Sequence, residues 1–524
     1  MHPFEAPAEG YQGACAGIFL AVNGRYEQLR ALAGEIWDIE KASGLLSWDE
    51  ETGMPPGGAH ARAEQKATLQ RLAHERWISD ELAELLEELR QFEAEHDHDS
   101  DEASLVRVMR HDHEKARRVP VELHAEIVRA GSLGYQAWLE ARAREDFSVL
   151  LPHLERNLEL RRRYVECFGP QDDPYDPLLD DYEPGMKTSD VDPVFEQLKA
   201  ALVPMIAAVK EAEPVDDSCL RGYFPLDAQR RFSVWVMEHW GYDPATWRLD
   251  GTVHPFATAF ATTDIRLTTR FQPDHLGGVI ACLHEFGHGI YERQVSPTLE
   301  RTPLASGVSA AMHESQSRMW ENLVGRSLAT WRVFYPKLQE ELPQFADVPL
   351  TTFHRAINKV QPSLVRTEAD EVTYNLHVIL RYEIERELLS GTLALADLPD
   401  AFNAKMRDYL GLDPPDLVRG VLQDAHWSDL GFGYFPTYSL GNVISVQIWE
   451  RAQNDLGDLE EQFERGEFGA LRDWLGEHVH RFGRKFTAAE TVQRTAGGPI
   501  DPAPYVAYLE RKLRDVFGAA VGAS

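Results

Sequence analysis

Apolar residues recur at spacings of three and four along most of the chain from Tyr26 onward. Long examples run from Glu64 to Leu89 and from Leu151 to Val165, where Leu, Ile and Val are interspersed with charged residues. This periodicity predicts amphipathic helices. Breakers such as 54–58 and 172–184 separate the helices, but no linker is long enough to divide the chain and no internal repeat is found. We therefore predict one large, mostly helical domain over residues 25–524.

A period of two replaces the helical period in one place. The segment from Thr262 to Phe271 places Ile265 and Leu267 on one face and polar residues on the other, which is typical of a β-strand. Together with the preceding segment 252–260 it is expected to form a small antiparallel sheet beside a helical cleft. The alternative is a surface hairpin without a functional role.

Composition and charge exclude several classes of protein. The chain has 524 residues, of which 43% are hydrophobic and 26% charged, values that are ordinary for a globular protein. Its net charge of −32 opposes binding to nucleic-acid phosphates and to anionic lipid surfaces, so neither nucleic acid nor a membrane is an expected partner. No run approaches the roughly 18 apolar residues that cross a bilayer.

The cysteines and the amino-terminal segment bear on location. The four cysteines are scattered and form no CxxC pair, which favours a reducing, cytoplasmic environment. Residues 1–24 lack the basic start of a secretory signal, and we expect them to form a disordered N-terminal extension.

A candidate metal site lies in the sequence His284-Glu285-Phe286-Gly287-His288. Two histidines four residues apart project from one face of a helix, as two ligands of one zinc ion require. Glu285 has the place of a general base, which takes a proton from a metal-bound water without binding the metal. Because this short motif occurs by chance in about 5–10% of chains of this length and composition, the competing interpretation is a pair of surface histidines that bind no metal.

A catalytic zinc needs a third protein ligand, often a carboxylate from a neighbouring helix. The helical run that begins at His313 offers Glu314, which lies far enough after His288 for the chain to turn and bring a second helix alongside. Spacing alone leaves His313, Glu314 and Glu321 as rivals for the third position.

Several short motifs, in this order along the chain, resemble the carboxypeptidase Taq family of thermostable zinc carboxypeptidases. The resemblance covers nearly everything after the N-terminal extension. It rests on Leu46 to Asp49, Leu179 to Met186, His254 to Phe256, Asp264 to Thr268, His284 to His288, His313 to Gln316, Val365 to Asp370, and Gly420 to Trp427.

The resemblance implies a fold, an activity and a set of site residues. It implies that His284, His288 and Glu314 hold the metal and that Glu285 is the catalytic carboxylate. It also implies an elongated helical fold with a deep substrate groove, a small sheet lining that groove, and a homodimer. The expected cofactor is one Zn²⁺ per chain, with Co²⁺ as a possible substitute.

The expected reaction releases single residues from peptide C-termini with broad specificity. The oxyanion formed on attack by water needs a hydrogen-bond donor besides the metal. His426, Tyr434 and Tyr438 are the candidates, and we favour Tyr438 slightly over His426. For each of them the alternative is a buried side chain whose hydrogen bonds are satisfied within the protein.

An exopeptidase must recognise the free terminal carboxylate of its substrate. A guanidinium forms a bidentate pair with this group, and we choose Arg366 for the role. The alternative is an ion pair between Arg366 and Asp370, four residues later on a helix. His254 is expected to line the same pocket.

The polar-faced strand that begins at Asp264 is predicted to receive the substrate backbone as an added strand, which would explain broad specificity. Asp264 and Arg266 are included among the substrate-binding candidates on this basis. The alternative is that these two residues simply pair with each other.

Two other functions remain open from the sequence. A zinc oligoendopeptidase would use the same metal chemistry but cut inside short peptides, and product analysis distinguishes it. A non-catalytic peptide-binding protein would keep the groove without hydrolysis, although every expected ligand and Glu285 are present.

Overall fold

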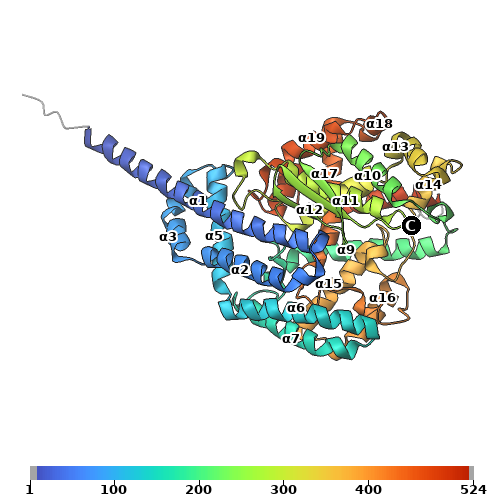
Figure 1. Ribbon diagram of the computed structural model, residues 1–524, viewed down its shortest axis with the longest axis horizontal. Coiled ribbons are helices and arrows are strands. Elements are labelled where there is room, and N and C mark those ends of the chain that lie inside the picture. Colours follow the sequence, from blue (N-terminus) through green and yellow to red (C-terminus); the bar gives the residue numbers. More distant parts are fainter. Residues whose placement is uncertain (1–8, 519–524) are drawn as a thin grey trace, which may run out of the picture.

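The computed structural model of the chain describes residues 9–518 and is built mainly of helices (Figure 1). The helices that precede the sheet are α1 (Glu9–Thr52), α2 (Ala59–Trp77), α3 (Asp80–Glu88), α4 (Arg90–Glu95), α5 (Asp101–Arg118), α6 (Val121–Arg144), α7 (Phe147–Glu166), α8 (Asp176–Leu179), α9 (Thr188–Glu211) and α10 (Leu226–Trp240). The predicted predominance of helix is confirmed. Within the described residues, no helix combines the length and the apolar character that crossing a bilayer requires.

Helix α1 begins inside the segment expected to be an N-terminal extension. Its first half projects from the body of the molecule, and its second half lies across α2 and the sheet (Figure 1). Residues 1–8 lie outside the described part of the chain, so the disorder expected for 1–24 and the domain boundary at residue 25 remain predictions.

The sheet has three strands in the order β1 (Trp247–Gly251), β3 (Asp264–Thr269), β2 (Ala257–Ala261). Strands β2 and β3 pair in the antiparallel sense that the sequence predicts. Strand β1, which the sequence pattern did not indicate, pairs with β3 in parallel, so the sheet is mixed. On β3, Ile265 and Leu267 are fully buried as their alternation requires, and the sheet packs against α11 (Gly277–Arg293).

The position of β3 overturns one expectation. Because β3 has a hydrogen-bonded neighbour on each side, it has no free edge and cannot receive a substrate backbone as an added strand. The free edge next to α11 belongs to β2. The amide of Thr268 donates to the Phe256 carbonyl, so Phe256 directs its main-chain groups toward β3. In an antiparallel pair this direction alternates along the strand, so Thr258 also bonds toward β3. Ala257 and Ala259 therefore direct their N–H and C=O groups away from β3, at the free edge of the sheet.

The helices after α11 complete the body of the molecule and are joined by turns and by two longer segments, 358–373 and 411–434, each of which contains a short 3-10 helix. They are α12 (Ala310–Arg318), α13 (Leu328–Glu341), α14 (Leu350–Ile357), α15 (Tyr374–Ser390), α16 (Leu398–Leu410), α17 (Phe435–Leu456), α18 (Leu459–Glu464), α19 (Gly469–His478), α20 (Ala488–Ala496) and α21 (Ala503–Phe517). A π-helical segment, η4 (Met319–Val324), continues directly from α12.

Helix α12 lies between α11 and α17 and approaches both unusually closely. A methyl group on Gly287 of α11 would come within 2.5 Å of the Gln316 carbonyl oxygen of α12. A methyl group on Gly441 of α17 would come within 2.6 Å of the Cβ atom of Glu314. Glycine is therefore required at both positions, and the three helix axes are held close together.

The start of α12 is fixed by a loop from a distant part of the sequence. The Ser309 side chain caps the helix by accepting from Met312 N, and the buried carboxyl group of Glu183 accepts from the Ala311 amide at 2.6 Å. The Tyr182 carbonyl accepts from Ala310 N. Amide groups that the first turn of a helix leaves unpaired are thus satisfied, and the helix that carries Glu314 starts at a defined place.

Candidate metal centre

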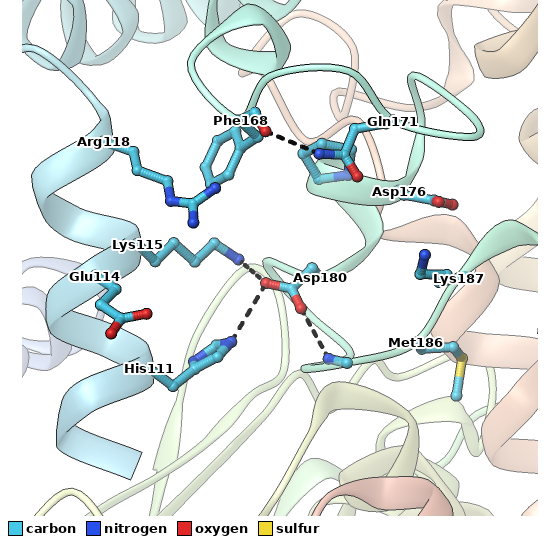
Figure 2. A pocket seen from close by; sticks show the side chains of 12 residues that line it. His111, Glu114, Lys115, Arg118, Phe168, Gln171, Asp176, Asp180, Met186 and Lys187 are labelled. Atoms are coloured by element: carbon cyan, nitrogen blue, oxygen red, sulfur yellow. Dashed lines mark hydrogen bonds and ion pairs between the residues drawn. The ribbon is translucent and has the colours of Figure 1, made fainter. Parts of the chain in front are cut away.

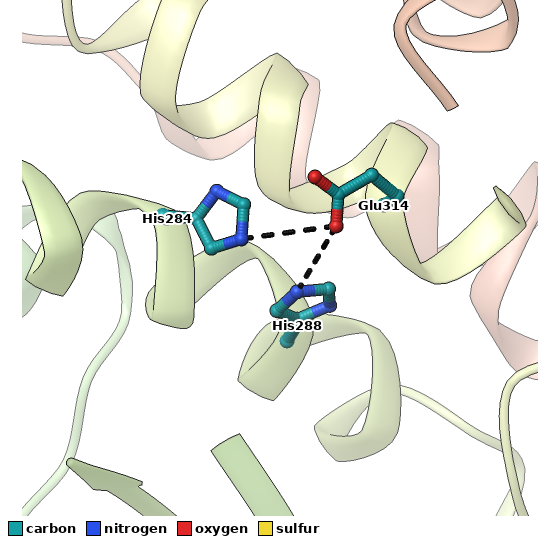
Figure 3. A group of neighbouring side chains, drawn as sticks. All are labelled: His284, His288 and Glu314. Atoms are coloured by element: carbon teal, nitrogen blue, oxygen red, sulfur yellow. Dashed lines mark ion pairs between the residues drawn. The ribbon is translucent and has the colours of Figure 1, made fainter. Parts of the chain in front are cut away.

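Helices α11 and α12 bring three potential ligands to one point. His284 and His288 lie one turn apart on α11 and face Glu314 of α12 (Figure 3). The Glu314 Oε2 atom lies 3.8 Å from His284 Nε2 and 3.7 Å from His288 Nε2. All three ligand atoms lie within 4.8 Å of one another. A four-coordinate ion with bonds of about 2.0–2.1 Å separates its ligand atoms by roughly 3.3 Å, so a small side-chain adjustment brings the three onto one ion.

The remaining polar atoms of these ligands already have partners. Nδ1 of His284 lies 2.9 Å from Oε2 of Glu321, and the backbone of His313 accepts a hydrogen bond from His288. The other Glu314 oxygen accepts from Arg318 Nε at 2.7 Å. These contacts leave one nitrogen of each histidine and one carboxylate oxygen facing the centre, and outer partners of this kind orient metal ligands. The donor set therefore fits a divalent metal ion.

The same contacts separate the rivals for the third position. Glu321, placed by the π-helical turn η4, lies behind His284 and is also held by Arg318 and Arg326. His313 turns to Glu292, with 2.8 Å between Nε2 and Oε1. Of the three candidates, only Glu314 directs an oxygen between the two histidines.

Glu285 lies beside this group on α11 and is buried. Burial raises the pKa of its carboxyl group to about 7. Its Oε2 atom has no hydrogen-bond partner within the described protein. A buried carboxylate oxygen of this kind needs an outside partner, such as a water molecule in the pocket.

The three ligands and Glu285 line a pocket of about 520 Å³ between β2 and α17. Tyr434 and Tyr438 form part of its wall, whereas His426 lies behind Tyr438, with 3.5 Å between Nε2 and the hydroxyl oxygen. His254 is exposed on the turn before β2 and does not line this pocket, although the next residues, Pro255 and Phe256, do.

Arg366 is buried, but its partner is not the predicted one. It starts a short 3-10 helix, and Asp370 bonds instead to the amide groups of neighbouring loop residues. The alternative of an Arg366–Asp370 ion pair is therefore wrong. Arg366 pairs with Asp424 at 2.9 Å, donates to the Tyr374 hydroxyl at 2.8 Å, and lies 5.0 Å from the ring centre of Tyr438.

Asp424 is shared between two guanidinium groups, because Arg381 also pairs with it at 2.6 Å. The spacing of the motif around Arg366 could not identify Asp424 as its partner, because Asp424 lies 58 residues away in the sequence. The cluster of Arg366, Arg381 and Asp424 carries one more positive than negative charge inside the protein. Burial and this charge lower the pKa of His426 to about 4, so its imidazole is neutral at ordinary pH.

Asp264 and Arg266 pair with each other, as the alternative interpretation of the strand expected. Arg266 donates two hydrogen bonds to the Asp264 carboxylate at 2.9 and 3.0 Å, and its guanidinium also lies over the rings of Trp48 and Phe260. Neither residue lines the pocket at the metal centre.

A helical body with a histidine-glutamate-histidine helix, a second helix that supplies a glutamate, and a strand edge beside them defines a metal-dependent peptidase. The sequence pattern of the family described as carboxypeptidase Taq (M32) metallopeptidase matches residues 28–513. The chain belongs to this family and is a metallocarboxypeptidase.

Individual relatives agree in sequence and in structure. The chain is 40% identical to thermostable carboxypeptidase 1 of Thermus thermophilus over 504 residues, which cover 94% of this chain and 99% of that protein. It is 37% identical to carboxypeptidase 1 of Bacillus subtilis, with coverage of 93% and 97%. The crystal structure of an M32 carboxypeptidase from Deinococcus radiodurans superposes with a TM-score of 0.91 at 39% identity, covering 95% of this chain and all of that one.

Proposed function

We propose that the protein is a zinc-dependent carboxypeptidase that removes single residues from peptide C-termini with broad specificity. His284, His288 and Glu314 would hold the ion, and Glu285 would act as general base. The observation that carries this assignment is the convergence of the three ligand atoms beside a buried carboxylate with an unpaired oxygen. A bound zinc ion would supply Lewis-acid activation of the scissile carbonyl and lower the pKa of the attacking water.

Glu285 takes a proton from that water and returns it to the leaving amine. A carboxyl group whose pKa lies near 7 is suited to both transfers at neutral pH. Tyr438 donates a hydrogen bond to the developing oxyanion. Its pKa is raised well above the ordinary value by burial, so the hydroxyl keeps its proton and remains a donor. Tyr434 lines the same wall, and His426 supports Tyr438 from behind.

The terminal carboxylate of the substrate is recognised by the charge of Arg366. Arg366 and Arg381 share the single carboxylate of Asp424, which leaves one positive charge without a counterion. Tyr438 contacts both this cluster and the pocket, so a carboxylate bound beside Tyr438 would be stabilised by the excess charge. His254 remains a candidate for substrate contact only if the turn before β2 moves.

The substrate backbone pairs with the free edge of β2. Ala257 offers its outward N–H and C=O groups next to the metal centre, and Ala259 offers its N–H group, because the Ala259 carbonyl already accepts from Lys41. Pairing through main-chain groups would explain broad specificity, because it makes little use of substrate side chains. With the C-terminal end directed toward Tyr438, the rest of the peptide would pass Ala259 and leave toward α1.

Other properties remain predictions. Zinc rather than cobalt as the native metal is tested by metal analysis of the purified protein, and the homodimer by light scattering. An oligoendopeptidase would release internal fragments, whereas we expect successive loss of single C-terminal residues. A cytoplasmic location is expected from the cysteine content alone.

Glu285→Gln tests the division of roles at the metal centre. We expect hydrolysis to be abolished while metal content stays nearly unchanged, because Glu285 is assigned to proton transfer and not to coordination. Glu314→Ala should lose both metal and activity, since a three-ligand site holds its ion poorly with two. Metal analysis after dialysis measures the first property and peptide assays measure the second. Loss of metal from Glu285→Gln would place Glu285 among the ligands.

A further inference from the structure

Lys41 of α1 reaches into the substrate groove beside strand β2. Its Nζ atom donates to the outward-facing carbonyl of Ala259 at 2.7 Å and lies 4.1 Å from the centre of the Trp37 ring. Lys41 lines both the metal pocket and a second cavity of about 760 Å³ that continues from it between α1, α5 and the loop before α12. The ammonium group therefore lies where the two cavities meet.

The ammonium group of Lys41 has no carboxylate within 4.0 Å among the side chains that the structure describes. Another lysine of the same groove provides the contrast. Lys115 of α5 pairs with Asp180 at 2.5 Å and Asp181 at 2.8 Å, and Figure 2 shows it pointing directly at Asp180 beside His111. Lys115 thus has two direct carboxylate partners, and Lys41 has none among the described side chains.

Carboxylates near Lys41 are occupied elsewhere. Glu40 accepts a hydrogen bond from the Trp77 indole, and Glu300 accepts one from Thr262 N. Glu292 accepts a hydrogen bond from Gly307 N and contacts the His313 ring. These groups influence Lys41 only at longer range. Burial is the largest effect on Lys41 and lowers its pKa, and the attraction of Glu292, Glu40 and Glu300 opposes this effect only in part. An ammonium group has three N–H donors, and Ala259 takes one of them.

The direction of the bound peptide places Lys41 relative to the scissile bond. This step rests on the proposed function. Ala259 lines both the metal pocket and the second cavity, whereas Ala257 lines the metal pocket alone of the two. A substrate strand along β2 with its C-terminus near Tyr438 therefore runs from Ala259 toward Ala257. Ala259 and Lys41 then lie beside residues on the N-terminal side of the scissile bond. Because Lys41 already occupies the Ala259 carbonyl, main-chain pairing ends here, and a side chain of the substrate meets the ammonium group.

We propose that Lys41 forms an anion-binding subsite that selects peptides with an aspartate or glutamate shortly before the scissile bond. The carboxylate of that side chain would take the free N–H donors of Lys41 and form the direct ion pair that the described side chains do not provide. The enzyme would then combine tolerance for the released residue with a preference for acidic residues upstream of it.

Matched peptides test this subsite. The peptides have a C-terminal phenylalanine and carry Glu or Gln at each position in turn before the scissile bond. Their N-termini are acetylated, so that no free N-terminal amine pairs with the Glu side chain. The kcat/KM ratio of each Glu–Gln pair is measured for the wild type, Lys41→Met and Lys41→Arg. Lys210→Met is the matched control, because Lys210 also bonds to backbone carbonyls but lies away from the groove.

We expect the wild type to favour Glu over Gln at one position on the order of tenfold, mainly through KM, and added salt to reduce the preference. Lys41→Met should abolish it while leaving the Gln peptides nearly unaffected, and Lys41→Arg should retain most of it.

The absence of a Glu preference in the wild type overturns the proposal, even if Lys41→Met does not fold. Equal losses on Glu and Gln peptides also overturn it, and would make Lys41 a clamp on Ala259. Internal cleavage by the wild type would contradict the proposed function instead, because it appears in the products and not in the Glu–Gln ratio.

Discussion

Arg366 illustrates how much a single residue depends on partners far away in the sequence. Its guanidinium is almost fully buried and shares Asp424 with Arg381, which leaves the cluster with an excess positive charge. A buried charge without a full counterion is costly for the protein. A substrate carboxylate that approaches Tyr438 would reduce this cost, and an amide would not.

Amidating the C-terminus of a peptide should therefore weaken its hydrolysis strongly. Loss of a buried charge partner costs on the order of 2–5 kcal/mol, or roughly 30- to 5,000-fold in kcat/KM. Arg366→Ala should cost a comparable factor with the free acid and barely change the poor turnover of the amide. Steady-state assays of both peptides with both proteins measure this coupling.

Arg248→Ala is a suitable control, because Arg248 pairs with Asp250 on the exposed part of β1 and should affect neither peptide. If Arg366→Ala depresses the acid and the amide equally, Arg366 has a structural role in holding Asp424. The carboxylate receptor would then have to be sought at Arg270, since Arg266 is already paired with Asp264.

Spacing in the sequence indicated the candidate ligands His284 and His288, but it left Glu314 as one of three rivals and did not show the partners that support them. The spacing of His284, Glu285 and His288 on one helix is a local property, and the sequence therefore contains it. Glu321 was considered as a ligand because spacing cannot show that a π-helical turn would place it behind His284. Asp424 was missed as the partner of Arg366 because that contact joins a 3-10 helix to a separate loop.

At the scale of elements, the metal centre depends on how closely α17 approaches α12. Gly441→Ala would place a methyl group 2.6 Å from the Glu314 Cβ atom, so one helix must move. We expect a loss of about 1–3 kcal/mol in unfolding free energy, together with weaker metal binding, because Glu314 moves with α12. Urea unfolding of the metal-free protein and metal titration measure the two effects separately.

Gly24→Ala in α1 is the matched control. A methyl group there meets nothing within 4 Å, so the substitution should be neutral or stabilise the helix by up to about 1 kcal/mol. Unchanged metal affinity in Gly441→Ala would mean that α12 holds Glu314 in place independently of α17.

The elements themselves were predicted with unequal success. Helix α7 and strand β3 followed from periodicity, because each has one apolar face, whereas the predicted helical run 64–89 is divided between α2 and α3. Strand β1 lacked a clear alternation and was missed, and its pairing made β3 central. Sequence alternation reports which faces of a strand are buried but not how many neighbours the strand has, so the assignment of the substrate edge to β3 was wrong.

For the molecule as a whole, buried carboxyl groups make stability depend on pH. Burial raises the pKa of Glu183 from 4.5 to about 8. Between these pH values the folded protein holds a proton that the unfolded chain releases. The contribution of Glu183 to the free energy of unfolding is therefore complete below about pH 4.5 and is lost as the pH rises toward 8. The buried Glu385, with a pKa raised to about 7, acts in the same direction.

Wild-type stability should therefore decline between pH 6 and pH 8, with Glu183 contributing roughly 1 kcal/mol per pH unit. Glu183→Gln cannot ionise and should show a shallower decline, even if its stability is lower at every pH. Urea midpoints at several pH values compare the two proteins. Parallel curves would indicate that Glu183 is ionised in the folded protein and caps α12 as a carboxylate.

The close contacts of α12 at Gly287 and Gly441 also bear on which ions the protein accepts. Calcium requires six to eight oxygen ligands at 2.3–2.6 Å, so it would need a wider coordination sphere than two imidazoles and one carboxylate offer. Because α12 packs closely against Gly287 of α11 and Gly441 of α17, moving Glu314 outward together with its helix would disturb both contacts. Selection among ions would then be set by bond length and ligand number, which are fixed by helix spacing, more than by the intrinsic affinity of the ligands.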